Sequence, residues 1–595
     1  MAQNADTQVP EQDGPAAPSP PSMTSATAYC YSTLPGPRHI RLVKLDMKDD
    51  MYSKDRPNPL WDSKEDITCT LETFHLEDAP PYEALSYTWG TPMTVFQNAD
   101  KCAEYEQVFS QPRSVLCDGK AISVTVNLFD SLLVLRRIPS DSYEQLADAP
   151  RAEYIWIDSI CIDQENITER NAQVTIMSEI YRQAQSVFIW LGRDDIFTRP
   201  AANVLMNLSK LPDSSVAAMK RESYIFGESK GKSFGLPSFD TGTWLSVYAF
   251  LHRSWFKRVW ILQEVALARR TAVLCGLVGM QWPMLVQASE KLFYSGWYAD
   301  LASTAKDYMD GRSPSALGQF RGIDETAKYL HQVDYDPMFH TPKTIVGVTD
   351  TRGGLGIEDN VLKLTESRKA FNFTELMEFF RYSLSSEPRD KVYSLYGLLP
   401  KDGPDRPHGI ETPMADYRKS IATVYTEAAW LQLRWAKNLD LLGHVQDAAH
   451  TKTLGLPSWV PDYKVMLLPN PLSETIGYVP YGSKKIDKVF DACGDLQFTC
   501  PPPSEELQLI LPIEAILVDT IAQTSAFEKG HSLSEVLSLL PEMPHLYWAD
   551  VVAQAKKRKQ GGVGDDSDGL TIRIKNGYSL DPPTASEGKP IPTHP

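Results

Sequence analysis

The stretch Tyr154-Ile-Trp-Ile-Asp-Ser-Ile-Cys-Ile-Asp-Gln164 decides the predicted fold of this chain. Residues 154–160 are rich in aromatic and β-branched side chains, which is typical of a buried strand. A helix should begin at Asn166, because Glu169 stands three residues later, as in a capping box. A second apolar run, Val187-Phe-Ile-Trp-Leu191, is followed by Gly192. Strand, helix and strand at this spacing predict a βαβ unit with neighbouring parallel strands.

Upstream of this unit, the chain contains two further predicted strands and a short helix. His39-Ile-Arg-Leu-Val-Lys-Leu45 alternates well enough for a strand, and Tyr82-Glu-Ala-Leu-Ser-Tyr-Thr-Trp-Gly90 reads as a second strand that ends in a glycine turn. Asn127 is the expected N-cap of a helix that runs to Arg137. The N-terminal half is therefore predicted to be an α/β domain.

Downstream, the spacing of apolar residues becomes mostly that of helices. Residues 195–250 are expected to be an insertion of helix and loop, and Trp255 to Ala268 a helix. Thr374–Tyr382 and Tyr417–Trp435 have the clearest amphipathic patterns. Pro-bounded runs such as Leu507–Leu511 indicate short strands near the C-terminus. The predicted organisation is a disordered leader (1–30), an α/β domain (31–280), a helical region (281–455), a mixed β-rich region (456–560) and a flexible tail (561–595).

Composition and charge exclude several functional classes. The 595 residues have a formal net charge of −17 and are 42% hydrophobic. A strongly acidic surface repels phosphate, so we expect neither nucleic acid nor a membrane surface as a general partner. Leu507 to Ala522, the most apolar stretch, is broken by Pro512, so no membrane span is predicted.

The chain termini and the cysteines indicate where the protein works. The leader has neither a basic start nor an apolar stretch, so no secretory signal is expected. The eight cysteines include no C-x-x-C pair, which favours a reducing, cytoplasmic setting over a disulfide framework or a zinc ribbon. Lys556-Lys-Arg-Lys559 has two interpretations, a weak nuclear-import signal or basic residues at a helix C-terminus.

The sequence contains only weak motifs for the binding of nucleotides or metal ions. Gly227-Glu-Ser-Lys-Gly-Lys-Ser233 has three residues between its glycines, whereas a phosphate-binding loop requires four. The histidines form no H-x-x-x-H pair, and we predict neither a catalytic metal nor a bound cofactor.

The carboxylates of the central stretch are candidates for ligand binding. Asp158 and Asp163 lie near the end of a predicted parallel strand, where α/β sheets bind ligands. The alternative is that they accept backbone hydrogen bonds in the turn and cap the next helix. Cys161 lies in an apolar run and is expected to be an inert buried thiol.

Three motifs together resemble the fungal heterokaryon-incompatibility (HET) domain family. Tyr82–Gly90 is similar to its opening motif, Trp156–Gln164 to its central motif, and Ser254-Trp-Phe-Lys-Arg-Val-Trp-Ile-Leu-Gln-Glu264 to its third. Two later segments, Pro388–Gly397 and Leu456–Tyr463, resemble parts of long family members. The resemblance implies a role in non-self recognition and programmed cell death in a filamentous fungus, with self-association or an unknown protein partner.

HET domains are also thought to be distant relatives of TIR domains, which implies a TIR-like or flavodoxin-like parallel sheet with insertions. In TIR domains a Trp is followed four residues later by a glutamate that is catalytic in members that cleave NAD. Trp260 and Glu264 have that spacing here. The insertion between Gly192 and Ser254 departs from the TIR pattern and could rebuild or block a pocket.

The resemblance therefore makes Glu264 the candidate catalytic residue, with NAD as a candidate substrate. Candidate substrate-binding residues are Tyr87, Trp89, Asp158, Asp163, Gln164 and Trp260. For the aromatic residues the alternative is core packing, and for Glu264 it is an ion pair with Arg258 or Lys257 or a bridge between elements. Three functions follow as hypotheses: a HET effector of cell death, a NAD glycohydrolase, and a non-enzymatic scaffold or regulator.

Overall fold

The computed structural model describes residues 26–48, 61, 65–92, 108–219, 233–309, 345, 373–399, 409–445 and 451–465. The chain divides into two compact units, and all of these residues belong to the unit made of residues 1–487 and 495–503. Most of the predicted leader, the predicted strand at 507–511, the basic run 556–559, the tail and the glycine-rich loop 227–233 lie outside the described residues, apart from Ser233.

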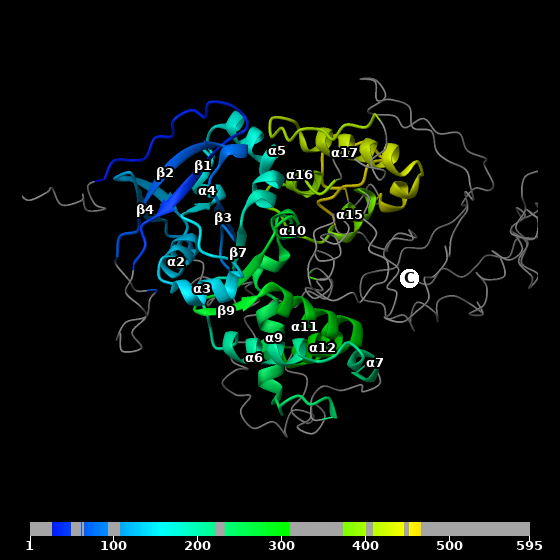
Figure 1. The fold of residues 1–595 in the computed structure, drawn as a ribbon. Helices are drawn as coiled ribbons and strands as arrows, with labels where there is room; N and C mark the ends of the chain where they lie inside the picture. The colour runs from blue at the N-terminus through cyan, green and yellow to red at the C-terminus, as the bar shows by residue number, and fades with distance from the viewer. Residues whose placement is uncertain are drawn as a thin grey trace, which may run out of the picture. The chain divides into compact units, whose positions relative to one another are not determined.

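A nine-stranded sheet forms the centre of the described structure (Figure 1). Its order is β5-β4-β2-β1-β6-β3-β7-β8-β9. The strands are β1 (His39–Leu45), β2 (Thr68–His75), β3 (Tyr82–Tyr87), β4 (Arg113–Cys117), β5 (Lys120–Val124), β6 (Tyr154–Trp156), β7 (Ser186–Trp190), β8 (Thr271–Cys275) and β9 (Val278–Gln281).

The sheet is mixed, whereas a TIR-like or flavodoxin-like parallel sheet with insertions was expected. Strands β6, β3, β7 and β8 are parallel, whereas β1 pairs antiparallel with β6 and with β2, β4 pairs antiparallel with β5, and β9 pairs antiparallel with β8. The prediction that β6 and β7 are neighbours is wrong, since β3 lies between them and pairs with both. Numbered along the chain, the parallel strands have the order 2-1-3-4, which is the order of flavodoxin-like sheets.

The predicted strand at 154–160 is only half as long as expected. After β6 the chain turns into the short helix α4 (Asp158–Cys161). The Asp158 carboxylate accepts a bond from Ser159 N at 2.7 Å, and Ile157 N donates to Cys161 Sγ at 3.3 Å. These local bonds satisfy backbone groups that a longer strand would present to its neighbours.

Helix α5 (Ile167–Gln183) begins where the sequence predicts. Asn166 caps it, with its side chain accepting a bond from Glu169 N at 3.2 Å. The second half of the expected capping box is absent, because the Glu169 carboxylate binds Arg41 and Asp163 N instead. Helix α5 therefore ties the turn after β6 to β1.

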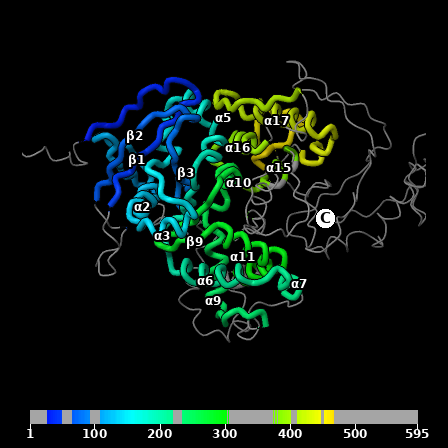
Figure 2. The backbone as a smooth tube through the Cα atoms, viewed as in Figure 1, coloured from blue at the N-terminus to red at the C-terminus, as the bar shows by residue number. Residues whose placement is uncertain are grey.

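Helix α2 (Val126–Leu135) starts earlier than expected, with Thr125 as its N-cap in place of Asn127. Asn127 has another role, because its side chain donates to Thr88 O at 2.7 Å and accepts from Trp190 Nε1 at 2.8 Å. Helix α3 (Ser140–Ala147) follows. Figures 1 and 2 show α2 and α3 on one side of β3, with α5 on the other.

The predicted helix at 255–268 is divided into two short pieces, η3 (Ser254–Lys257) and α10 (Ile261–Ala266). Between them, Arg258 forms a parallel β-bridge with Leu384, and Val259 N donates to Leu384 O at 2.9 Å. This long-range pairing competes with helical hydrogen bonds and explains the break. Strands β2, β4, β5, β8 and β9 were not predicted.

Helices dominate the remaining described residues. Helices α6 (Thr198–Ser209), α7 (Ser215–Met219), α9 (Thr241–Leu251), α11 (Trp282–Ser295) and α12 (Trp297–Met309) gather below the sheet in Figure 1. Residues 373–465 contain α15 (Phe373–Phe379), α16 (Asp390–Tyr396), α17 (Ile421–Ala436) and η4 (Asp440–His444). No helix in the described part of the chain is long and apolar enough to cross a membrane.

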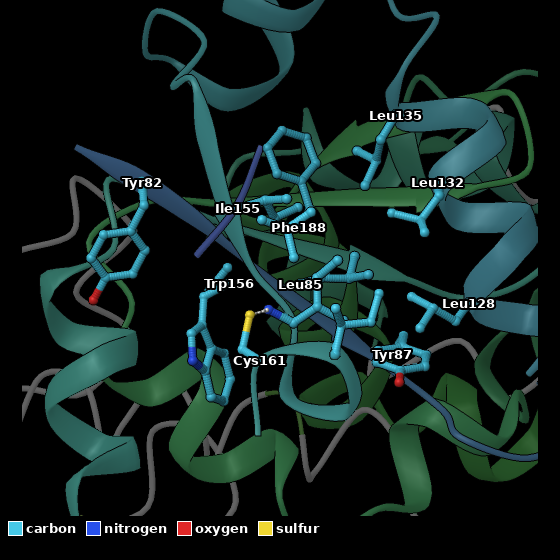
Figure 3. Close-up of a cluster of buried hydrophobic side chains, with 14 of the residues drawn as sticks. Tyr82, Leu85, Tyr87, Leu128, Leu132, Leu135, Ile155, Trp156, Cys161 and Phe188 are labelled. Carbon is cyan, nitrogen blue, oxygen red and sulfur yellow. Dashed lines mark hydrogen bonds between the residues drawn. The ribbon is translucent and has the colours of Figure 1, made fainter. Parts of the chain in front are cut away.

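The core lies between the sheet and its helices. Figure 3 shows Leu128, Leu132 and Leu135 of α2 pointing toward the strands that carry Leu85 and Phe188. Strand β3 is buried along its whole length, and its side chains alternate between the two faces. Tyr82 and Ser86 face α5 and α10, because Tyr82 donates to Ile180 O and Ser86 bonds to Glu264.

Candidate functional site

A hydrogen-bonded network lies at the carboxyl end of β3. Ser86 Oγ donates to the Glu264 carboxylate and accepts a bond from Trp255 Nε1 at 2.8 Å. All three side chains are buried. Ser86 comes from the first motif and the other two residues come from the third, so strand β3 and the η3–α10 segment are joined through one hydroxyl group.

Glu264 is a buried carboxyl group. Its side chain belongs to α10, and the residue is only 3% exposed. Burial raises its pKa to about 7, while the charge of Arg258 and the bond from Ser86 act in the opposite direction. A carboxyl group with a pKa near neutrality can hold or release a proton under physiological conditions.

Arg258 is the cation of this region. Its guanidinium donates to Tyr87 O, the last carbonyl of β3. Its charge opposes the rise in pKa that burial causes in both Glu264 and Asp158. Arg258 was predicted only as an alternative ion-pair partner of Glu264.

Asp158, which follows β6, is linked to this network by charge, because it raises the pKa of Glu264. Its carboxylate accepts a bond from Trp89 Nε1 at 2.8 Å, and its backbone carbonyl accepts from Gln164 Nε2 at 2.9 Å. Burial raises the pKa of Asp158, and Arg258 and the Trp89 bond oppose that shift.

Two aromatic residues follow from β3. Tyr87 is buried and donates to Ser159 Oγ at 2.6 Å. Trp89 is 41% exposed and presents an aromatic surface at the edge of the network.

Five of the seven predicted residues lie in or against this network, and two point elsewhere. Asp163 accepts a bond from Glu165 N at 3.2 Å, which matches the turn-capping alternative. Trp260 donates its indole N–H to Asp390 Oδ2 at 3.0 Å, toward the helical region. Its backbone carbonyl accepts from Glu264 N, but the two side chains have different partners.

Neither Trp255 nor Ser86 was predicted to belong to the site. Both residues lie inside the quoted motifs, but no spacing rule pairs a strand serine with a carboxylate 178 residues later. Cys161 is buried, and burial raises its pKa to about 12, as expected for an inert thiol.

The segment 253–264 occupies the place where flavodoxin-like sheets bind ligands, beyond the carboxyl ends of β3 and β7. Arg253 is buried and donates to Leu191 O at 2.9 Å and to Arg193 O at 3.0 Å. Ser254 Oγ donates to Thr91 O at 2.7 Å. Residues 253–264 therefore cover this end of the sheet, and a substrate could reach the buried Glu264 only after this segment moves.

Two other features bear on ligand binding. Among the residues that the structure describes, no group of three or more His, Cys, Asp or Glu side chains could hold a metal ion. A hollow of about 900 Å³ lies between α3, α6 and the β8–β9 hairpin, lined by residues such as Leu146, Met206 and Leu277. None of the network residues lines it, so the hollow and the buried carboxylates are separate features.

Comparison with known proteins identifies the segment that carries the network. The family model for heterokaryon incompatibility protein (HET) matches residues 82–264. These residues are a HET domain. The matched segment begins with β3 and ends at Glu264. Its first and third motifs meet at Ser86, and its central motif contacts the first through the bond from Trp89 to Asp158.

A curated relative extends the similarity beyond the HET domain. Heterokaryon incompatibility protein 6, OR allele, from Neurospora crassa is 27% identical over 454 residues. The alignment covers 71% of this chain but only 58% of the relative, so the chain spans little more than half of that protein. No solved structure matches.

Proposed function

We propose that this chain is an effector of heterokaryon incompatibility, in which self-associated HET domains impair the growth of the fungal cell. The observation that carries this proposal is that three separate family motifs contact one another at the carboxyl end of β3, through the bond of Ser86 to Glu264 and the bond of Trp89 to Asp158. The name of the Neurospora crassa relative supports the same process. We expect the chain to act in the cytoplasm together with further copies or with a protein partner.

Induced expression in fungal hyphae tests this proposal. Trp89→Ala removes an exposed side chain and its bond to Asp158, whereas Leu277→Ala removes a side chain of similar exposure, 42%, outside the network. We expect the wild type and Leu277→Ala to slow growth and Trp89→Ala to slow it less. If the wild type accumulates and hyphae grow normally, the proposal is wrong.

A second candidate function is NAD glycohydrolysis, favoured by the position of the Glu264 carboxyl group, which is buried and bonded to Ser86 at the carboxyl end of β3, where α/β sheets bind ligands. In this reaction the bond between C1′ of the ribose and the nicotinamide nitrogen breaks, and a water oxygen bonds to C1′. Nicotinamide, ADP-ribose and a proton are the products. An ionised Glu264 beside the ribose would stabilise the oxocarbenium-like transition state. The cover over Glu264 would have to move first.

Nicotinamide release by the purified full chain at high concentration tests the second candidate. We expect turnover by the wild type and its loss in Glu264→Gln, with thermal melts showing that the variant is folded. If neither protein releases nicotinamide over hours, NAD cleavage is excluded. Growth impairment that persists in Glu264→Gln would then favour a non-enzymatic scaffold.

A further inference from the structure

The segment of residues 384–397, which we call the clamp segment, lies against the HET-domain residues that cover Glu264. Leu384 forms the β-bridge with Arg258, accepting from Val259 N and donating its own N–H to Lys257 O. These backbone bonds hold the residues on both sides of Arg258. Because Leu384 is 54% exposed, side-chain burial explains little of this contact, and the backbone pairing carries it.

Asp390 of the clamp segment makes a second attachment, next to α10. Its two carboxylate oxygens accept bonds from Trp260 Nε1 at 3.0 Å and from Tyr417 OH at 2.6 Å. Trp260 is the N-cap residue of α10, whose fourth residue is Glu264. Asp390 thereby fixes the start of the helix that carries the buried carboxylate.

Close packing makes a third attachment. Gly397 follows α16, and a Cβ atom at this position would lie 2.6 Å from Ser178 Cβ of α5 and would also meet the side-chain amide of Gln263. Only glycine permits this approach. Asn171 of α5 adds bonds to Asp416 at 2.9 Å and from Tyr417 N at 3.1 Å.

We propose that the clamp segment is an autoinhibitory contact, which holds η3–α10 over the crevice and keeps Glu264 bonded to Ser86. Displacement of residues 384–397 would free Arg258 and α10 together, because both are attached to the same stretch of chain. The carboxylate would then face solvent and substrate. That this contact inhibits the protein rests on the proposed function. The contact itself can be tested separately.

Hydrogen–deuterium exchange of the full chain tests the contact. Asp390→Ala removes both acceptors, and we expect amides 259–266 to exchange roughly tenfold faster or more, since hydrogen bonds to a charged group are lost. Asp390→Asn keeps an acceptor for Trp260 and should restore most of the protection. Asp462→Asn is the matched control, because this buried carboxylate of the helical region binds the backbone of Lys452 and Thr453.

Unchanged exchange at 259–266 in folded Asp390→Ala would overturn the proposal, as would equal acceleration in Asp462→Asn. If Asp390→Ala does not fold, Gly397→Ala provides the same test through steric displacement of the clamp segment from α5.

Hyphal growth tests the inhibitory role: Asp390→Ala should slow growth at least severalfold more than the wild type. Normal growth with both proteins, together with faster exchange, would retain the contact and reject the effector function.

Discussion

At the scale of single residues, the Ser86 hydroxyl has two buried partners, and its removal leaves both of them unsatisfied. Ser86→Ala should lower the free energy of unfolding by about 1–3 kcal/mol, because Glu264 and the Trp255 indole lose a bond. Ser186 on the neighbouring strand β7 is an equally buried serine whose Oγ has no hydrogen-bond partner. Ser186→Ala should therefore be close to neutral. Equal unfolding midpoints in urea for both variants would contradict this assignment.

The protonation of Glu264 makes stability depend on pH. Its pKa is about 7 in the folded protein against an ordinary 4.5, so the folded state binds the proton more tightly between these values. The free energy of unfolding contributed by this group is therefore fully present below pH about 4.5 and falls as the pH rises to about 7. Glu264→Gln should remove that part of the dependence.

Thermal melts of the wild type and Glu264→Gln between pH 5 and 8 measure this effect. We expect the variant to gain stability relative to the wild type as the pH rises, on the order of 1–3 kcal/mol at pH 8. Glu83, which is also buried with a pKa of about 7, and Asp390, with a pKa of about 6, leave a residual slope in both proteins. Parallel curves would contradict the burial of a titrating Glu264.

At the scale of secondary-structure elements, one buried ion pair joins β1 to α5. Arg41 binds the Glu169 carboxylate with both of its terminal nitrogens, at 2.6 and 3.0 Å, and also donates to Cys161 O. Glu169→Ala should lower the free energy of unfolding by about 3–5 kcal/mol, since it leaves a buried guanidinium without its counterion. Glu165→Ala, in the exposed turn before α5, should change it little. Similar urea midpoints for both variants would refute this role.

The elements that sequence predicted correctly are those with local signals. Strands β1, β3 and β7 and helix α5 were expected because their apolar patterns and the Asn166 cap lie within short windows. Helix α10 was expected as part of a longer helix, because the break before it depends on the pairing of Arg258 with Leu384, which lies far along the chain. The order of the strands could not be predicted for the same reason. Strand β1 lies beside β6 through the pairing of Val43 with Ile155, and no local sequence pattern links these two residues.

The candidate site was predictable to a similar extent. Family resemblance singled out Trp89 and Glu264, and its place after a predicted parallel strand singled out Asp158. The fold brings these residues to one end of β3 and β6. Resemblance also suggested that Trp260 lines the site, but its N–H group is directed to Asp390. That contact depends on how residues 373–465 pack on α10, which a motif within the HET domain does not encode.

At the scale of the whole molecule, the net charge of −17 opposes the self-association that the proposed function requires. Like-charged copies repel one another, and salt screens that repulsion. We therefore expect sedimentation velocity to show more assembly at high than at low ionic strength. Assembly that weakens with added salt would indicate contacts between opposite charges and would contradict this expectation.

The growth rate of hyphae after induced expression of the full chain tests the central claim most directly. The account predicts that the wild type slows radial growth relative to an empty vector, and that Trp89→Ala slows it less at equal accumulation on an immunoblot. Growth equal to that of the empty vector with both the wild type and Asp390→Ala, at confirmed accumulation, would contradict the claim that this HET-domain protein is an effector.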